Sequence, residues 1–496
     1  MVDKWGRRTA GIRGALVSTA WLAIFAGTTS VPVPAQPGEL EPAAVGSTPA
    51  RYGLQPGLEL LFTAAMEMTI TGPYSEQSNR AFETRFVVMN ENQAGNWEIM
   101  GVSKLAKRIM DGEELPDPFG TPEAYLFEMD DYGRFRGYKG EEPQFGTAWT
   151  PMIHFPPLPA GGVPSESRST RPLPVYIGLG EDLQGWYSFR WLPAGDAFSQ
   201  YGAMMQYPVQ ARDIPVTISY QEHEMRFDLR KRLPASSRSS YQIQMNTPIG
   251  GLDVELQVEN QLNQANLYPS DVMKPLVNEI TRYFALRNPL QALNIEKMKK
   301  EDVEKKLEDM ITFSRTSRVP FLRDAAGSVI VHTRYRMRLN ENFQKVARLT
   351  PAPPFRRLSV QNQPIQVPSP AAKPVVVLFW ALWWGPSEQA LWDMETFRKA
   401  NAGQEVEYVA VNLDRMESFA QNYVLKSGIQ IPVIWDNGYP DSGIAMEYGV
   451  RRIPEIVVID RLGRISGRDV QPEQLAAMLE RLTRKEEYPE IRKGIR

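Results

Sequence analysis

The sequence predicts a multidomain α+β protein, with an antiparallel β-rich region and a few helices in its N-terminal part and an α/β fold in its C-terminal part. The length of 496 residues is enough for two or three domains. Between about residues 51 and 340, apolar and polar residues alternate over long stretches, as in strands with one dry and one wet face. After residue 352, a short apolar run precedes a helical pattern, which indicates a buried central strand followed by a helix.

The first 35 residues have the pattern of a secretory signal peptide. Basic residues precede an apolar stretch at 15–27, and the small residues at 33–35 resemble a cleavage site. The apolar stretch is too short for a comfortable membrane span. We therefore predict a periplasmic or secreted protein with no stable membrane span after cleavage. The alternative is a protein that keeps this segment as an N-terminal membrane anchor.

Residues 51–340 are predicted to form a β-rich domain or domains. Alternation of apolar and polar residues predicts antiparallel strands at 214–220, 252–258 and 329–339. Apolar residues at helical spacing predict two helices, at 270–284 and 296–313. No known family is identified in this region.

Residues 141–174 are rich in Pro, Gly and Ser, so we expect a long surface loop or a boundary between two β-rich subdomains. The sheet of this region can be filled by its own side chains, which is the more common outcome. The alternative is an open sheet around an apolar groove, as in envelope lipid carriers.

Several classes of function have no support in the sequence. A net charge of -2 gives no electrostatic reason to expect binding to nucleic acid or to an anionic membrane. The three histidines lie far apart without metal-ligand spacing, and His332 is expected on the wet face of a strand. A glycine-rich segment at 178–185 lacks the spacing of a dinucleotide loop and predicts a turn. No metal or cofactor is therefore expected.

The run Phe379-Trp380-Ala381-Leu382-Trp383-Trp384-Gly385-Pro386-Ser387 is the most informative segment of the chain. It resembles F-W-A-x-W-C-x-P-C, the active-site turn of thioredoxin-fold oxidoreductases. Residues 352–485 resemble the thioredoxin-like family of the bacterial envelope, the TlpA/ResA type within the AhpC/TSA grouping.

The order of further motifs strengthens this resemblance. A-P-P-F at 352–355 resembles the opening hairpin of the family, and residues 406–414 and 431–436 resemble two of its strands. The block at 448–463 resembles Y-G-V-x-x-x-P-x-x-x-x-I-D-x-x-G. The resemblance implies that Pro454 in this block is cis and faces the active-site turn.

Both cysteine positions of the turn are substituted, by Trp384 and Ser387, and the chain contains no cysteine. Exchange of disulfides requires a thiolate. The resemblance implies a thiol-disulfide oxidoreductase, but the residues that would perform the reaction are missing. Because the rest of the motif is intact, we interpret the region as a scaffold kept for another role and expect no enzymatic activity from it.

The working hypothesis is a redox-inactive binding module of the cell envelope. The resemblance implies a groove between the turn and Pro454 that could hold an extended peptide or an envelope protein. Its predicted lining residues are Trp383, Trp384, Gly385, Pro386, Ser387, Ile453 and Pro454. Trp384 could be exposed there, or it could fold back into the space of the lost disulfide. The alternatives are an oxidoreductase by resemblance only and a carrier of lipids or other hydrophobic ligands that uses the β-rich region.

Overall fold

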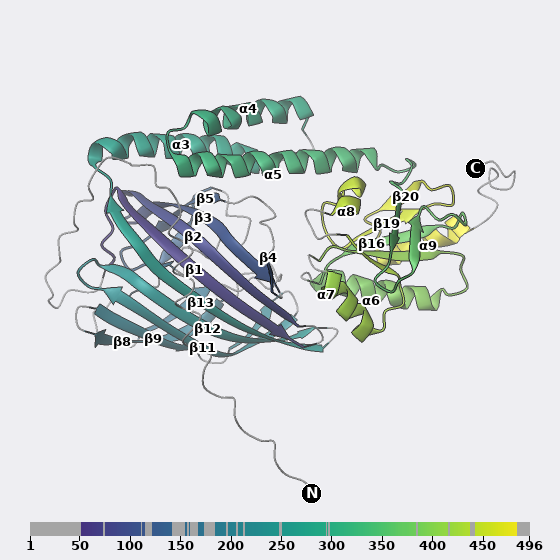
Figure 1. The fold of residues 1–496 in the computed structure, drawn as a ribbon, viewed down its shortest axis with the longest axis horizontal. Helices are drawn as coiled ribbons and strands as arrows, with labels where there is room; N and C mark the ends of the chain where they lie inside the picture. The colour runs from purple at the N-terminus through teal and green to yellow at the C-terminus, as the bar shows by residue number, and fades with distance from the viewer. Residues whose placement is uncertain are drawn as a thin grey trace, which may run out of the picture. The chain divides into compact units, whose positions relative to one another are not determined.

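The fold is described by a computed structural model. It describes residues 51–72, 75–110, 112–114, 122–140, 154–155, 158, 167–172, 184–194, 197–204, 207–211, 214–247, 250–293, 295, 298–382, 385–414, 417–436 and 442–483. These residues form a large antiparallel sheet, three long helices and a smaller mixed α/β region (Figure 1). The predicted signal peptide, residues 1–35, lies outside the described residues.

The described part of the N-terminal region is built on one antiparallel sheet. Its strand order is β6-β5-β3-β2-β1-β13-β12-β11-β9-β8-β7, with β4 paired to β3 and β10 paired to β11. The strands are β1 (Leu58–Thr71), β2 (Glu76–Glu91), β3 (Trp97–Met110), β4 (Glu113–Glu114), β5 (Glu123–Met129), β6 (Phe135–Tyr138), β7 (Ser167–Pro172), β8 (Gln184–Ala194), β9 (Ala197–Met204), β10 (Tyr207–Ala211), β11 (Ile214–Asp228), β12 (Leu233–Thr247) and β13 (Gly250–Leu267).

Alternation of side chains in the sequence produces this sheet. From Phe62 to Thr71, every second residue of β1 is buried, and the residues between them are partly or fully exposed. The strands predicted at 214–220 and 252–258 are confirmed as parts of β11 and β13. They are antiparallel to their neighbours, as expected.

Three helices pack together and against one face of the sheet. They are α3 (Ser270–Gln291), α4 (Lys300–Thr316) and α5 (Pro320–Lys345). Val87, Met100 and Val102 of the sheet share a core with apolar residues of all three helices. The first two helices are confirmed, since α3 covers the helix predicted at 270–284 and α4 covers most of the one predicted at 296–313.

The strand predicted at 329–339 is wrong, because these residues lie within α5. Pro320 starts this helix, at a position where its missing N–H group costs no hydrogen bond. Ala326, Ile330 and Thr333 are buried at helical spacing, whereas Val331 is 57% exposed. The β-branched residues and the arginines at every second position have the alternation that is typical of a strand, which led to the wrong prediction. His332 therefore lies on a helix and not on the wet face of a strand, and burial lowers its pKa to about 4.

Part of the opposite face of the sheet is filled by the protein's own side chains. Phe155 packs against the rings of Phe62 and Phe86, with centroid distances of 5.9 and 5.0 Å. Beside it, His154 is fully buried, and its Nδ1 lies 2.6 Å from the Asn260 side-chain oxygen. Burial lowers the pKa of His154 to about 3, which keeps the ring neutral. These contacts agree with a self-filled sheet in the described part of this face.

The segment at 141–174, expected to be a loop or a boundary, is described only in part. Residues 167–172 form β7 and so are not loop. Strands on both sides of the segment belong to the same sheet. Most of the segment, and the turn predicted at 178–185 up to residue 183, lie outside the described residues.

The C-terminal region is a mixed five-stranded sheet flanked by helices, the arrangement of a thioredoxin-like fold. Its strand order is β18-β17-β16-β19-β20, preceded by the hairpin β14-β15. The pairs β16-β17 and β17-β18 are parallel, and β16-β19 and β19-β20 are antiparallel. The elements are β14 (Phe355–Leu358), β15 (Pro364–Val367), β16 (Val375–Trp380), α6 (Gly385–Ala400), β17 (Glu407–Asn412), α7 (Glu417–Ser427), β18 (Val433–Trp435), α8 (Gly443–Tyr448), β19 (Glu455–Ile459), β20 (Ile465–Arg468) and α9 (Pro472–Thr483).

The central strand β16 is buried on both faces, as its continuous apolar sequence predicts. Val376, Leu378 and Trp380 face a core that includes residues of α6, α7 and α9. The residues between them, such as Phe379, face a second core with α8 and the β14-β15 hairpin. The helix expected after this apolar run is confirmed as α6.

The last turn of α5 packs against the C-terminal region. The Asn342 side-chain amide donates a 2.8 Å hydrogen bond to the backbone oxygen of Met446 in α8. The ring of Phe343 lies under two guanidinium groups, with centroid distances of 3.4 Å for Arg451 and 4.4 Å for Arg468. Helix α5 is therefore a structural part of this region as well as of the helical layer.

Candidate functional site

The substituted turn lies between β16 and α6. Trp383 and Trp384 are outside the described residues. Whether the Trp384 side chain is exposed or folds back into the space of the lost disulfide therefore stays a prediction with two alternatives. Helix α6 begins at Gly385. Pro386 is exposed, and Ser387 is fully buried. The Ser387 side chain therefore points into the protein and not toward the surface.

A buried carboxylate fixes the entrance to this turn. The backbone N–H of Leu382 donates to both carboxylate oxygens of Asp414, at 3.0 Å each. The Asn412 amide donates to the same carboxylate at 2.6 Å. The Trp435 indole N–H donates to the Asp414 backbone oxygen at 2.7 Å. Asp414 follows β17, so its carboxylate links Leu382, which leads into the turn, to the neighbouring strand.

A second buried carboxyl group lies in the first turn of α6. Glu388 is 3% exposed, and it accepts a 3.1 Å hydrogen bond from the Tyr423 hydroxyl. That hydroxyl accepts a 2.9 Å hydrogen bond from the indole N–H of Trp392. Burial raises the pKa of Glu388 to about 7, and the negative charge of Asp414 adds to this shift. Glu388 is consequently protonated below neutral pH.

The register of the sheet places Pro454 beside the turn. Phe379 of β16 pairs with Glu455 of β19 in an antiparallel ladder, so Pro454 and Ile453 continue alongside the residues that lead into the turn. The Ile453–Pro454 peptide bond is cis, which confirms the expectation from the resemblance. Among the described residues, no backbone group donates to or accepts from the backbone of Ile453.

The chemistry available at this place is limited. The Ser387 hydroxyl is buried and has no hydrogen-bond partner among the described residues. None of the three histidines lies in the C-terminal region, so no imidazole base stands beside Ser387. The described residues include no cluster of acidic or histidine side chains that could hold a metal. The site can present backbone and apolar groups to a ligand, but it has no nucleophile for disulfide exchange.

The sequence motif identified the turn and Pro454 but not the polar groups beneath them. Asp414, Glu388 and Tyr423 were not predicted as site residues. A signal existed for two of them, because Asp414 ends the second strand motif and Glu388 directly follows Ser387. Nothing in the sequence near Tyr423 indicates that its hydroxyl reaches Glu388.

Comparison with known proteins supports the family resemblance of the C-terminal region. Residues 349–468 match the family model of the AhpC/TSA family. The thiol-disulfide oxidoreductase ResA of Bacillus anthracis is 27% identical over 135 residues, which are 27% of this chain and 76% of that protein. ResA of Halalkalibacterium halodurans is 27% identical over 106 residues, or 21% of this chain and 58% of that protein. The resemblance predicted from the turn is confirmed, although these relatives are named for a thiol reaction and this chain has no cysteine.

Solved structures also match part of this chain. A thiol-disulfide oxidoreductase from Bacteroides fragilis matches with a TM-score of 0.25 and 20% identity, covering 27% of this chain and 99% of that one. StoA from Bacillus subtilis matches with a TM-score of 0.23 and 20% identity, covering 26% of this chain and 96% of that one. Within the described ranges, each helix is too short or too polar to cross a membrane.

Proposed function

We propose that the C-terminal region is a redox-inactive thioredoxin-like module that binds an extended peptide segment of a partner protein. The groove would lie between the turn at 383–387 and the Ile453–Pro454 bond. Trp383, Trp384, Gly385 and Pro386 would line one wall and Ile453 the other. Ser387, which is buried, would support this wall from inside. Export of the protein, with removal of residues 1–35, is part of the same proposal.

One observation carries this proposal. The backbone of Ile453 has no hydrogen-bond partner among the described residues, and in the sheet register it continues alongside the residues that lead into the turn. An unpaired backbone edge can accept an extended chain, and apolar side chains beside it supply contacts that select the sequence. The buried support from Asp414 holds the turn where such a chain would pass.

The two alternatives have less support. A thiol-disulfide oxidoreductase needs a thiolate, and the chain has none. A carrier of hydrophobic ligands needs an open cavity in the sheet, whereas Phe155 and Leu158 fill the described part of that face. Retention of lipids through native purification would still favour the carrier.

The test uses a phage-displayed library of random 12-residue peptides, selected on the full chain. We expect Trp384→Ala to leave the melting temperature unchanged and to weaken the selected peptides at least tenfold, because an aromatic anchor contributes about 2 kcal/mol or more to an interface. Trp392→Ala is the comparison variant. It removes a partly buried ring and the hydrogen bond to Tyr423, so it should mainly lower stability. A sharp loss of stability in Trp384→Ala with unchanged peptide affinity would contradict the proposal.

A further inference from the structure

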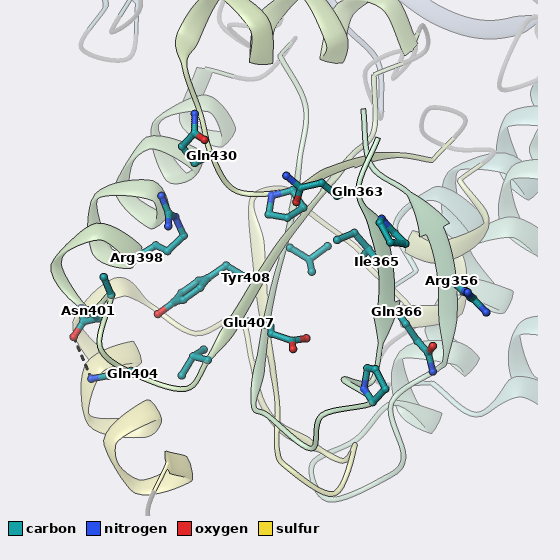
Figure 2. A pocket seen from close by; sticks show the side chains of 16 residues that line it. Arg356, Gln363, Ile365, Gln366, Arg398, Asn401, Gln404, Glu407, Tyr408 and Gln430 are labelled. Carbon is teal, nitrogen blue, oxygen red and sulfur yellow. Dashed lines mark hydrogen bonds between the residues drawn. The ribbon is translucent and has the colours of Figure 1, made fainter. Parts of the chain in front are cut away.

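A second groove lies at the edge of β17, away from the substituted turn. Its volume is about 590 Å³. Figure 2 shows Tyr408 at its centre, with Arg398 of α6 and Asn401, which follows that helix, on one side and Ile365 and Gln366 from the hairpin on the other. The groove thus has a wall on each face of the sheet and β17 along its base.

The base of this groove is an unpaired strand edge. On the outer side of β17, β18 pairs only with Ala410 to Asn412, and among the described residues no strand continues beside Glu407 to Val409. The Glu407 N–H donates to Pro374 on the β16 side, and the Ala410 N–H donates to Pro432 on the outer side. Backbone groups alternate in direction along a parallel strand, so the N–H and C=O of Tyr408 point outward into the groove.

Pro432 explains why the native sheet leaves this edge open. The ladder between β17 and β18 would next require an N–H at position 432 to donate to the Tyr408 carbonyl. Proline has no N–H group. The chain itself therefore ends the pairing at this point, and no described residue pairs with the outward N–H and C=O of Tyr408.

Two buried side-chain atoms in the groove also lack partners. Tyr408 is 8% exposed, and its hydroxyl has no hydrogen-bond partner among the described residues. The Gln404 side-chain oxygen is likewise buried without a partner there, although its nitrogen donates to Asn401 at 3.1 Å. Leaving such groups unpaired costs about 1–3 kcal/mol each. A ligand with donors and acceptors would recover this cost once the two side chains turn toward it.

The charges of the groove indicate what kind of ligand fits. Arg398 is already bound to Glu395 at 2.8 Å, and Glu407 accepts a 2.8 Å hydrogen bond from the Ser369 hydroxyl. Arg356 is exposed and lies at the rim. The remaining polar lining consists of the carboxamides of Gln363, Gln366, Asn401, Gln404 and Gln430. Uncharged polar groups therefore suit the centre, and an acidic group suits the end near Arg356.

We propose that this groove accepts an extended peptide segment of a partner protein, which adds to β17 as a strand through the backbone of Tyr408. The central residues of the segment are uncharged, and an acidic residue at one end faces Arg356. The site is separate from the groove proposed beside Pro454 and does not depend on it. Together with the groove proposed beside Pro454, it would give the C-terminal region two peptide sites, one beside the turn after β16 and one at the exposed part of β17.

The test compares two variants on the same stretch of chain. Ala402→Trp places a large ring in the groove, whereas Ala400→Trp places it on an exposed residue of α6 that does not line the groove. A phage-displayed library of random 12-residue peptides is selected on the full chain and counter-selected on the Ala402→Trp chain. Enriched peptides are then synthesised, and binding is measured by fluorescence anisotropy.

We expect enriched peptides to lose at least tenfold in affinity for Ala402→Trp and to bind Ala400→Trp and Trp384→Ala as they bind the unchanged chain. Methylation of alternate backbone nitrogens should abolish binding, because it removes the donors that pair with a strand edge. Tyr408→Phe should weaken binding three- to tenfold. The proposal is overturned if counter-selection enriches no peptide, or if the N-methylated peptides bind equally well. If the enriched peptides match segments of this chain, the groove binds a second copy of the protein, and the proposal of a different partner is overturned.

Discussion

Glu388 places an ionisable group inside the C-terminal region, and its effect on stability depends on pH. Its pKa is about 7 in the folded protein, against about 4.5 for an exposed glutamate. Below about pH 4.5 the side chain is protonated in both the folded and the unfolded protein, so it does not change the free energy of unfolding. As the pH rises from about 4.5 toward 7, the carboxyl group ionises in the unfolded chain but stays protonated in the folded protein. The free energy of unfolding therefore falls over this range. Above about pH 7, burial of the ionised side chain lowers the free energy of unfolding by the full amount of about 3 kcal/mol.

We predict that Glu388→Gln removes this pH dependence. The amide oxygen can still accept the hydrogen bond from Tyr423, while no charge is buried. The variant should be more stable than the unchanged chain by about 1–3 kcal/mol at about pH 8 and no more stable at about pH 4. Urea unfolding followed by tryptophan fluorescence at both pH values measures this. Glu417→Gln, at an exposed position, is the control. Equal pH dependence in both variants would show that Glu388 ionises as freely as a surface residue.

Among single residues, the sequence predicted those that belong to a motif and missed those whose role depends on folding. Pro454 could be assigned because a whole motif surrounds it, and it is cis as expected. Asp414 ends the strand motif at 406–414 and Glu388 directly follows Ser387, but no motif indicates that these carboxyl groups are buried, because burial depends on the packing of α6 against β17. Tyr408 was missed for the same reason, because its free backbone groups follow from the length of β18 and not from its own neighbours.

Among helices and strands, the spacing of apolar residues and the length of each pattern decided which predictions were correct. The short apolar run of β16 and the alternating run of β13 were both predicted correctly as strands. Residues 329–339 fit both a strand and a helix. Their β-branched side chains and the arginines at every second position fit a strand, while their buried positions fit a helix. Only the wider window from Pro320 to Lys345 shows the helical spacing.

The first turn of α6 should still support thiol chemistry if cysteines are returned to it. We predict that Trp384→Cys with Ser387→Cys gives a dithiol that forms a disulfide reversibly and reduces insulin, whereas the unchanged chain shows no turnover above a no-protein control. The two residues between the positions keep the spacing of the family motif, and a helix start lowers the pKa of a thiol below its free value of about 8.5.

The controls for this variant are the two single cysteine substitutions, which cannot form the internal disulfide. Intact mass before and after reduction reports pairing, and insulin turbidity reports turnover. If the double variant folds but its cysteines stay unpaired under oxidising conditions, the turn no longer has the geometry of the family.

In the molecule as a whole, helix α5 contacts both of the regions that the sequence separates. The sequence places a β-rich region before residue 340 and a thioredoxin-like region after 352. The structure shows that α5 serves both, because its last turn carries Phe343 under Arg451 and Arg468. Contacts between segments about 100 residues apart leave no local pattern in the sequence, so this junction could not be predicted.

Gly449 is the residue at which this junction is most sensitive to substitution. It ends α8 in the left-handed conformation, with φ of 64°. A Cβ atom at this position would lie 2.3 Å from the backbone nitrogen of Phe343. Backbone atoms of a helix cannot move aside as a flexible side chain can. We therefore predict that Gly449→Ala lowers the free energy of unfolding by about 2–4 kcal/mol and separates the last turn of α5 from α8.

The matched control is Gly443→Ala at the start of the same helix, where an added Cβ has nothing within 4 Å. This variant should be neutral or slightly stabilising, because alanine restricts the unfolded chain more than glycine does. Hydrogen exchange measured by mass spectrometry should show faster exchange at residues 338–345 in Gly449→Ala only. Truncating the ring with Phe343→Ala in the Gly449→Ala background should not restore stability, since the clash is with the backbone. If Gly449→Ala behaves like Gly443→Ala in both measurements, α5 does not pack against α8 in solution.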